Sequence, residues 1–209
     1  MTEQPDRVEY AVREDVAHVT LNAPPLNLLT VAMMGDLAEA VERAQADRSL
    51  KALAFTANGR AFSAGADVGE HRPEHAPQLI AAFSRLFGAL GRCELPVVMG
   101  VDGPALGAGF ELALMADVLL ASERASFGQP EIRLGFFAPV GVAWLPARIG
   151  LGRAIEVIST GRTYSPRELQ NMGLVTRTLP PEDLAAALES VLADLRRASP
   201  LVMRMNVRL

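Results

Sequence analysis

The sequence predicts an α/β fold in which strands alternate with helices and the C-terminal part is helical only. Two observations carry this prediction. Short apolar segments rich in β-branched residues recur between longer segments with helical periodicity, and turn or capping residues separate them. From about residue 181 onward the pattern is helical alone. The length of 209 residues fits one core with its following helices over residues 1–198, and the start of a further helical region at 199–209.

The N-terminal part is predicted to contain a hairpin, a helix and a buried strand. Residues 8–12 and 16–21 are β-rich and alternate between apolar and polar side chains around a short turn. Thr30 is a suitable N-cap for a helix over residues 31–47. The apolar run at 51–57 predicts a strand that is covered on both faces.

The central part is predicted to continue the alternation of strands and helices. Pro77 suits the first position of a helix, where its missing N–H has no consequence. The expected segments are a small-residue loop at 61–67, a helix at 77–91, a strand at 96–101, a helix at 107–115, a strand at 117–121 and a short extended segment at 125–134.

The C-terminal part is predicted to be mainly helical. Ser165 and Glu168 form a capping box around Pro166, which marks a helix start. The expected segments are helices at 140–148 and 151–159, a short strand at 175–179, a helix from Pro181 to about Ala198 and a last helix from Ser199 to Leu209.

Composition excludes several classes of protein and site. The net charge is −4 and the basic residues form no run, which argues against nucleic acid as a partner. Cys93 is the only cysteine, so an intrachain disulfide and a cysteine metal cluster are excluded. The N-terminus is polar, and the most apolar stretch, 96–121, contains three acids. We therefore expect a cytoplasmic protein without a membrane span.

A glycine-rich turn opens the helix expected at 107–115. Gly103, Gly107 and Gly109 do not have the G-x-G-x-x-G spacing of a dinucleotide-binding turn, and no Lys-Ser/Thr pair follows as in a P-loop. Such a turn can point backbone amides at an anion or a developing oxyanion. It can equally serve close packing of helix on strand, and the turn alone does not decide between the two.

Two further motifs resemble known catalytic patterns without completing them. Residues 61–65 nearly match a nucleophile elbow around Ser63, but a histidine far along the chain is lacking, which makes a serine triad improbable. His71 and His75 spell an inverted zinc-protease motif, but Pro73 between them would break the helix that this motif needs. We expect a small-residue loop and a solvated loop at these places, and no metal.

Two acids stand out in apolar surroundings. Glu111 lies in the first turn of the helix expected at 107–115, and Glu131 follows the turn Gln129-Pro130. Burying a carboxylate is unfavourable unless the group is paired or used. Glu111 could also cap its own helix, and Glu131 could be an exposed turn residue, so neither acid is decisive alone.

Taken together, these segments resemble the crotonase superfamily of enoyl-CoA hydratases and isomerases, over nearly the whole chain. The motifs that carry the resemblance are AFSAGAD at 61–67, PVVMGVDGPALGAGFELA at 96–113, ASFGQPEIRLG at 125–135, GLGRAIEVISTGR at 150–162 and the segment 166–175. Several motifs in the right order make the resemblance specific. It implies a spiral of ββα turns with a helical C-terminal region, and subunits that assemble as trimers or pairs of trimers. It also implies further C-terminal helices beyond Leu209, which cover the acyl pocket or dock onto a neighbour, so the chain looks truncated. Either the sequence is incomplete, or the lid over the pocket is supplied differently.

The resemblance implies a hydratase that adds water to the double bond of an α,β-unsaturated acyl-CoA thioester. The amides of Ala64 and Ala108 would form an oxyanion hole, and Glu111 and Glu131 would be the two catalytic acids. No cofactor is expected, since coenzyme A is part of the substrate. Substrate contacts are expected from Arg60, Phe62, Ala66, Asp67, Gly107, Gln129, Phe137 and Pro139. Arg60 suits a CoA phosphate and suits equally an exposed turn.

Narrower features look like cyclohexa-1,5-diene-1-carbonyl-CoA hydratases of aromatic breakdown. They are residues 67–73, 24–27 and 134–139. The segment 138–142 departs from the glycine-rich turn of ordinary enoyl-CoA hydratases, which puts straight-chain substrates of fatty-acid breakdown in doubt. Two alternatives stay open: a double-bond isomerase on the same scaffold, and a non-catalytic acyl-CoA-binding relative.

Overall fold

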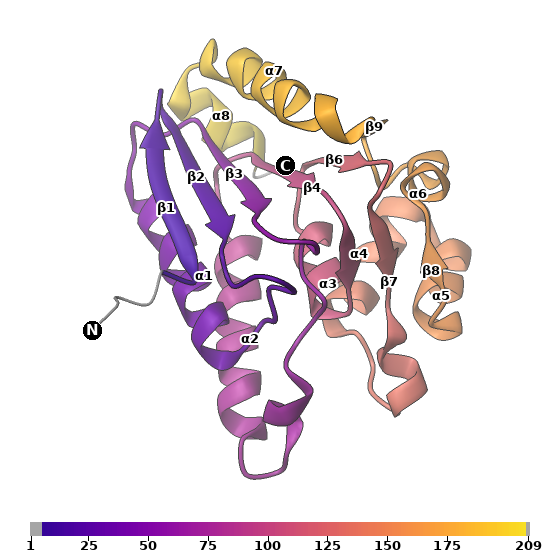
Figure 1. The fold of residues 1–209 in the computed structure, drawn as a ribbon. Coiled ribbons are helices and arrows are strands. Elements are labelled where there is room, and N and C mark those ends of the chain that lie inside the picture. Colours follow the sequence, from indigo (N-terminus) through magenta and orange to yellow (C-terminus); the bar gives the residue numbers. More distant parts are fainter. Residues whose placement is uncertain (1–5, 208–209) are drawn as a thin grey trace.

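The computed structural model describes residues 6–207 and confirms the α/β class (Figure 1). A six-stranded sheet has the order β1-β2-β3-β4-β6-β9. The first two strands form the antiparallel hairpin, and all further neighbours in this sheet are parallel. Its strands are β1 (Val8–Arg13), β2 (Val16–Leu21), β3 (Ala52–Ala57), β4 (Val97–Val101), β6 (Val118–Ser122) and β9 (Arg177–Leu179).

A second, three-stranded sheet has the order β5-β7-β8. It consists of β5 (Pro104–Leu106), β7 (Ser126–Gly128) and β8 (Thr163–Tyr164). Each of β5 and β7 follows directly on a strand of the first sheet, β4 and β6 respectively, and then leads into a helical segment. The chain therefore advances in ββα turns, as the resemblance implied.

The helices pack on both sides of the large sheet (Figure 1). The α-helices are α1 (Val31–Ala46), α2 (Ala76–Gly91), α3 (Ala108–Leu114), α4 (Pro139–Ile149), α5 (Leu151–Thr160), α6 (Pro166–Met172), α7 (Leu184–Arg196) and α8 (Pro200–Val207). Three single turns of 3-10 helix are η1 (Val68–His71), η2 (Pro130–Leu134) and η3 (Pro181–Asp183). Two predicted caps are confirmed: the Thr30 side chain accepts from the amide of Met33, and Ser165 with Glu168 forms the capping box.

Two hydrophobic cores lie on opposite faces of the large sheet. The larger core joins the sheet to α1, α2 and α3 and includes Phe55 and Phe110. The smaller core joins β2, β3, β4 and β6 to α7 through Leu184, Leu188 and Leu192. Parallel strands buried on both faces are expected to be continuously apolar, which explains the runs that predicted β3 and β4.

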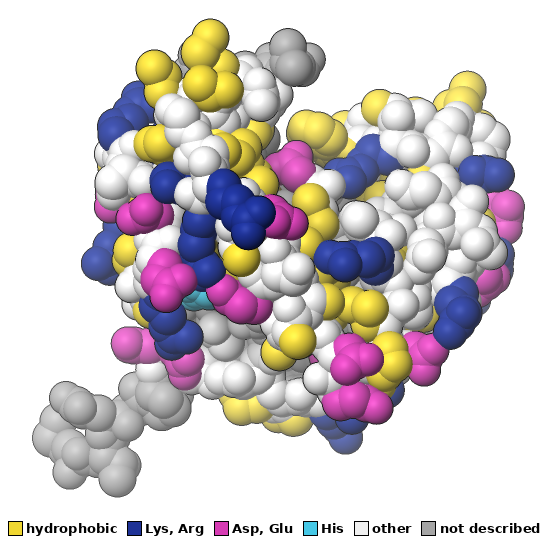
Figure 2. Space-filling model, turned by 90° about the horizontal axis from the view of Figure 1, so that it is seen from above, with side chains coloured by type: hydrophobic (Ala, Val, Ile, Leu, Met, Phe, Trp, Pro, Cys, Tyr) yellow, Lys and Arg dark blue, Asp and Glu magenta, His cyan; other side chains and the backbone are white. Residues whose placement is uncertain are grey.

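The last helix is fixed to the fold by one buried arginine. The Arg204 guanidinium on α8 donates to the carbonyl of Asp47 at 2.6 Å and lies 3.7 Å from the Glu94 carboxylate. Leu201, Val202 and Met205 on the same helix are exposed. Figure 2 shows that basic and acidic side chains are mixed on the face that α7 and α8 cover. The predicted helix 199–209 is confirmed as far as Val207; Arg208 and Leu209 lie outside the described residues.

Several boundaries differ from the prediction for local reasons. Pro77 is the second residue of α2, because Ala76 precedes it in the helix. The segment after Gly128 is the 3-10 turn η2 and not an extended one, because Pro130 starts a turn. The strand predicted at 175–179 is shorter, since the amides of Leu174 and Val175 both donate to the carbonyl of Leu169 at the end of α6.

The strands β5 and β8 have too few residues for a pattern, and the sequence did not predict them. Within residues 6–207, no helix is both long and apolar enough to span a membrane.

Candidate active site

The loop at 61–67 is held in place by one buried asparagine. The Asn27 side chain donates to the carbonyls of Asn58 and Ala61 and accepts from the amide of Ala23 at 2.8 Å. Its own carbonyl accepts from the Ser63 hydroxyl at 2.7 Å. The Ser63 hydroxyl is thus fully buried and used for structure, in agreement with the rejection of a serine triad.

The amides of this loop differ in whether they are engaged. The Ser63 amide donates to Pro104, the Ala64 amide to Leu26 at 2.9 Å, and the Gly65 amide to the Ser63 hydroxyl. Within residues 6–207, no acceptor is found for the amide of Ala66. The engaged Ala64 amide contradicts its expected place in an oxyanion hole, because a donor already paired to a carbonyl is not free for a substrate. Of the four consecutive amides from Ser63 to Ala66, only that of Ala66 is therefore left as an available donor within the described residues.

A second available amide lies at the start of α3. Ala108 is the first residue of α3, where a backbone N–H has no partner within the helix. Gly107 precedes it with φ +55°, which favours glycine, and its amide donates to the carbonyl of Gly128. A Cβ built on Gly65 would lie 3.8 Å from the Ala108 nitrogen. The loop of Ala66 and the start of α3 therefore face each other across a very short distance.

Glu111 is buried, with 2% of its surface exposed, and it accepts two backbone hydrogen bonds. Its Oε1 accepts from the amides of Val140 at 2.7 Å and Gly141 at 3.1 Å, in the first turn of α4. Pro139 occupies the first position of α4 and has no N–H, so the next two amides serve the carboxylate. Burial raises the pKa of Glu111 to about 7, the nearby Glu131 adds to this rise, and the two amides oppose it.

Glu131 lies on η2 and points at the start of α3. A Cβ built on Gly107 would overlap the Glu131 carboxylate, so this carboxylate lies directly against the glycine that precedes Ala108. Burial raises the pKa of Glu131, and the charge of His71 opposes this rise. Its Oε2 is buried and has no hydrogen-bond partner within residues 6–207. The structure thus brings both predicted acids and the amide of Ala108 to one place.

Gln129 is 1% exposed, and neither its amide nitrogen nor its amide oxygen has a hydrogen-bond partner within the described residues. A Cβ built on Gly141 would lie 3.3 Å from its Nε2, so the side chain lies beside the amides that hold Glu111. Buried polar groups are normally paired, and an unpaired amide at this place suits a contact with a ligand.

The other predicted substrate contacts take different places. Phe62 is fully buried in the large core and supports the loop, contrary to the expectation. The Asp67 side chain caps η1 by accepting from the amide of Gly69 at 2.7 Å. Arg60 is exposed on the turn before the loop, and Phe137 is 71% exposed between η2 and α4. These last two remain accessible to a ligand at the rim.

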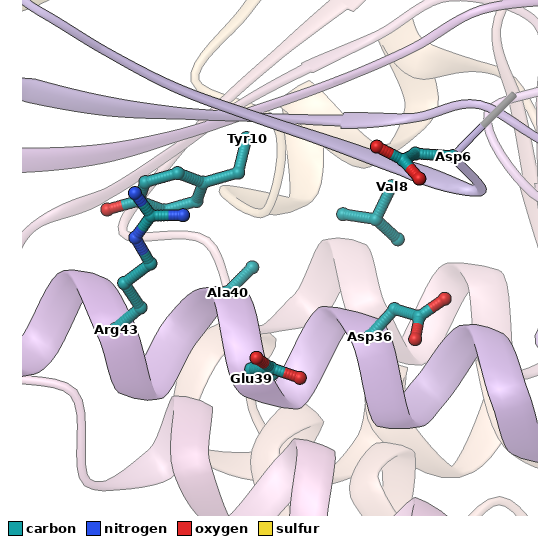
Figure 3. Close-up of a pocket in the computed structure, with 7 residues that line it drawn as sticks. All are labelled: Asp6, Val8, Tyr10, Asp36, Glu39, Ala40 and Arg43. Atoms are coloured by element: carbon teal, nitrogen blue, oxygen red, sulfur yellow. The ribbon is translucent and has the colours of Figure 1, made fainter.

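Other parts of the described chain offer less chemistry. Within residues 6–207, no group of three or more His, Cys, Asp or Glu side chains is placed to hold a metal ion. A hollow of about 340 Å³ lies between β1 and α1, where the Arg43 guanidinium stacks over the Tyr10 ring at 4.2 Å (Figure 3). None of its lining residues belongs to the candidate site.

A model of the enoyl-CoA hydratase/isomerase family matches residues 11–208. The chain belongs to this family. It is 36% identical over 193 residues to a probable enoyl-CoA hydratase, echA8, of Mycobacterium tuberculosis (strain CDC 1551 / Oshkosh), which covers 91% of the chain and 75% of the relative. A probable enoyl-CoA hydratase of Rhizobium meliloti (strain 1021) is 37% identical over 172 residues, covering 81% of the chain and 67% of the relative.

Solved structures agree with the family assignment. An enoyl-CoA hydratase of Mycobacterium smegmatis has a TM-score of 0.91 at 29% identity, covering 98% of this chain and 82% of that one. The protein is therefore an enzyme of the enoyl-CoA hydratase/isomerase family with the crotonase fold. In this family context, the convergence of Glu111, Glu131 and the start of α3 marks the candidate active site.

Proposed function

We propose that this enzyme adds water across the double bond of an α,β-unsaturated acyl-CoA thioester. The observation that carries the proposal is the meeting of the buried Glu111 carboxylate with the partly buried Glu131 carboxylate, beside the amide of Ala108, which has no acceptor within residues 6–207. A double-bond hydration needs one group that takes a proton from water and one that returns a proton to carbon. It also needs a place for the negative charge that develops on the thioester oxygen.

The amides of Ala66 and Ala108 are proposed to hold the thioester oxygen. Both belong to small residues on backbone segments that face each other, so a carbonyl can approach without a side chain in the way. Removing one such donor typically raises the barrier by about 2.7–4 kcal/mol. The proposed pair replaces the expected Ala64, whose amide is engaged with Leu26.

The two glutamates are proposed to move the protons. Water adds to the β-carbon and gives its proton to the ionised carboxylate, while the other carboxyl protonates the α-carbon, so that one water is added in total. Such acid–base help contributes about 10²–10⁴-fold to the rate. The negative charge of Glu131 raises the pKa of Glu111, so the two carboxyl groups are electrostatically coupled. We therefore expect them to titrate as a pair that holds one proton near neutral pH.

The test is the loss of enoyl-thioester absorbance with purified protein. Crotonyl-CoA and cyclohexa-1,5-diene-1-carbonyl-CoA are compared side by side, since the first represents straight-chain and the second cyclic substrates. Turnover of either supports the hydratase, and the ratio of the two kcat/KM values assigns the acyl class. If the absorbance of neither substrate decreases, the proposed hydration is contradicted. Isomerised product without hydrated product from a 3-enoyl-CoA would assign the enzyme to the isomerases.

Glu131→Gln is the variant that tests the mechanism. It keeps the shape of the side chain and removes the base, so we expect kcat to fall by about 10²–10⁴-fold. Circular dichroism should show an unchanged fold. Near-normal turnover of this variant would contradict the roles given to the two acids. The trimeric or hexameric assembly stays a prediction, which light scattering tests.

A further inference from the structure

His71 is held rigidly on the loop that follows the site amide of Ala66. Asp67 caps η1 through Gly69, and the Glu70 carboxylate accepts from the amide of Val31 at the start of α1 at 2.7 Å. The Nδ1 of His71 lies 2.8 Å from the carbonyl of Asp67. A carbonyl only accepts, so Nδ1 carries the proton and the imidazole has one fixed orientation.

The other side of the His71 ring lies against the segment that carries Glu131. The rings of His71 and Phe136 are 5.4 Å apart between centroids and inclined by 59°. The amide of Phe136 in turn donates to the carbonyl of Glu131 at 3.0 Å. One imidazole therefore connects the residue after Ala66 with the turn that holds the catalytic carboxylate.

We infer that His71 is a positioning residue of the active site, which fixes η2 with Glu131 against the loop of Ala66. The inference rests on the proposed function, because Ala66 and Glu131 are given their roles there. The thioester oxygen and the attacking water must be held in one geometry, and these two groups come from separate loops. His71 contacts both loops, through the carbonyl of Asp67 on one side and the ring of Phe136 on the other.

The electrostatics of the site agree with this placement. His71 on η1 is the titratable side chain whose charge acts on the pKa of Glu131, and Glu131 in turn raises the pKa of Glu111 on α3. Burial raises the pKa of Glu131, and two smaller effects lower it: the hydrogen bond from its own backbone amide and then the charge of His71. Replacing His71 by an uncharged residue should therefore move the titration of Glu131 to higher pH.

The second histidine of the same segment provides a matched control. His75 lies four residues further along, is exposed, and its side chain does not cap α2. His75→Phe makes the same chemical change as His71→Phe at a position without contact to the site. We expect it to leave turnover and its pH dependence unchanged.

The test compares wild type, His71→Phe, His71→Gln and His75→Phe. His71→Phe keeps an aromatic ring on Phe136 and removes the donor and the charge, whereas His71→Gln keeps a donor for Asp67. For both we expect kcat to fall by about tenfold or more, with a smaller change in KM, since a displacement of 1 Å costs about 100-fold. The limb of the pH–rate profile set by the glutamates should move to higher pH. Selective ¹³C labelling of glutamate side chains follows the Glu131 titration by NMR without any substrate.

The outcomes separate the inference from the proposed function. If the wild type hydrates a substrate and both His71 variants keep its kcat and pH profile, the inference is overturned and the proposed function stands. If the wild type turns over neither substrate, the proposed function fails. In that case the NMR titration still tests the inference: an unchanged Glu131 titration in His71→Gln would show that His71 does not act on Glu131, and would overturn the inference too. Thermal melts identify a variant that fails to fold, in which case the other variant decides.

Discussion

Glu111 shows how one buried side chain links stability to chemistry. Its pKa rises from the ordinary 4.5 to about 7, mainly because burial disfavours the charge. A carboxyl whose pKa is raised binds its proton more tightly in the folded state than in the unfolded state. The free energy of unfolding therefore falls as pH rises from about 4.5 to about 7, by roughly 3 kcal/mol in total.

Glu111→Gln should remove this pH dependence. The amide has no charge to bury, and its oxygen can still accept from Val140 and Gly141. At pH 8 we expect the variant to be more stable than the wild type by up to about 3 kcal/mol, and at pH 4 nearly equal. Urea denaturation at the two pH values checks this. Equal stability at pH 8 would contradict the raised pKa, and activity should be lost in either case.

Gly107→Ala adds only one methyl group, but we expect it to lower kcat strongly. The new methyl group would overlap the Glu131 carboxylate, and φ +55° is unfavourable for alanine. We expect Glu131 to be displaced and kcat to fall by about 100-fold. Gly35→Ala on α1 is the matched control, because nothing lies within 4 Å of its added Cβ. This control should keep full activity and gain about 0.5–1 kcal/mol of stability.

For single residues, the sequence predicted which acidic side chains lie together in the site. It did not predict which backbone amides of the 61–67 loop lack a hydrogen-bond partner in the fold. Glu111 and Glu131 stood out because acids are rare in apolar segments. The choice between Ala64 and Ala66 depends on which amide donates to the carbonyl of Leu26, and this partner lies more than 30 residues away in the sequence. Neither alanine carries a signal that separates them. Phe62 could not be assigned to the core or the site, since an apolar ring suits both.

Among the elements, α6 depends most visibly on its first turn. Ser165 and Glu168 hydrogen-bond each other's backbone amides, and Glu168 also accepts from Arg162. Ser165→Ala should reduce the free energy of unfolding by about 1 kcal/mol, because the amide of Glu168 loses its acceptor. Ser159→Ala, at an exposed position of α5, is the control and should change stability by less than about 0.5 kcal/mol. Equal effects of both changes would contradict the role of the cap.

Elements were predictable where local chemistry alone sets their limits. The capping residues Thr30 and Ser165 and the apolar runs of β3 and β4 mark their elements within the sequence. The strands β5 and β8 exist because they pair with β7, and this pairing is not visible in three and two residues. The turn η2 begins at Pro130, and a proline suits an extended segment as well as the start of a turn, so the shape of η2 was not predicted.

For the molecule as a whole, the large sheet separates the larger core, on the side of the candidate site, from the smaller core under α7. The site lies with α3, α4 and η2, whereas α7 closes the small core on the opposite face. Leu192→Ala should cost about 2–5 kcal/mol of stability, since the side chain is fully buried. The kcat per folded molecule should not change. The concentration of folded enzyme is measured by active-site titration. If kcat per folded molecule falls in Leu192→Ala, the small core on one face of the sheet influences the active site on the other face, contrary to this prediction.

The family resemblance predicted the ββα spiral, because several motifs of the family occur in the chain in the family's order. Periodicity alone predicted only the α/β class with a helical end. The helical end itself is held by Arg204, whose partners near Asp47 are far away in the sequence. Such long-range anchors decide how the C-terminal helices lie, and a local pattern contains no sign of them.

The groups proposed to receive the thioester oxygen belong to the main chain and not to side chains. A protein in which Glu111 and Glu131 are both glutamine would therefore keep its donors for the carbonyl while losing the groups that move protons. Such a double variant should hold an intact enoyl thioester for long periods instead of consuming it. It would serve as a trap for crystallising the unreacted complex and as a reagent for capturing the natural ligand from cell extracts, where mass spectrometry could identify the acyl chain directly.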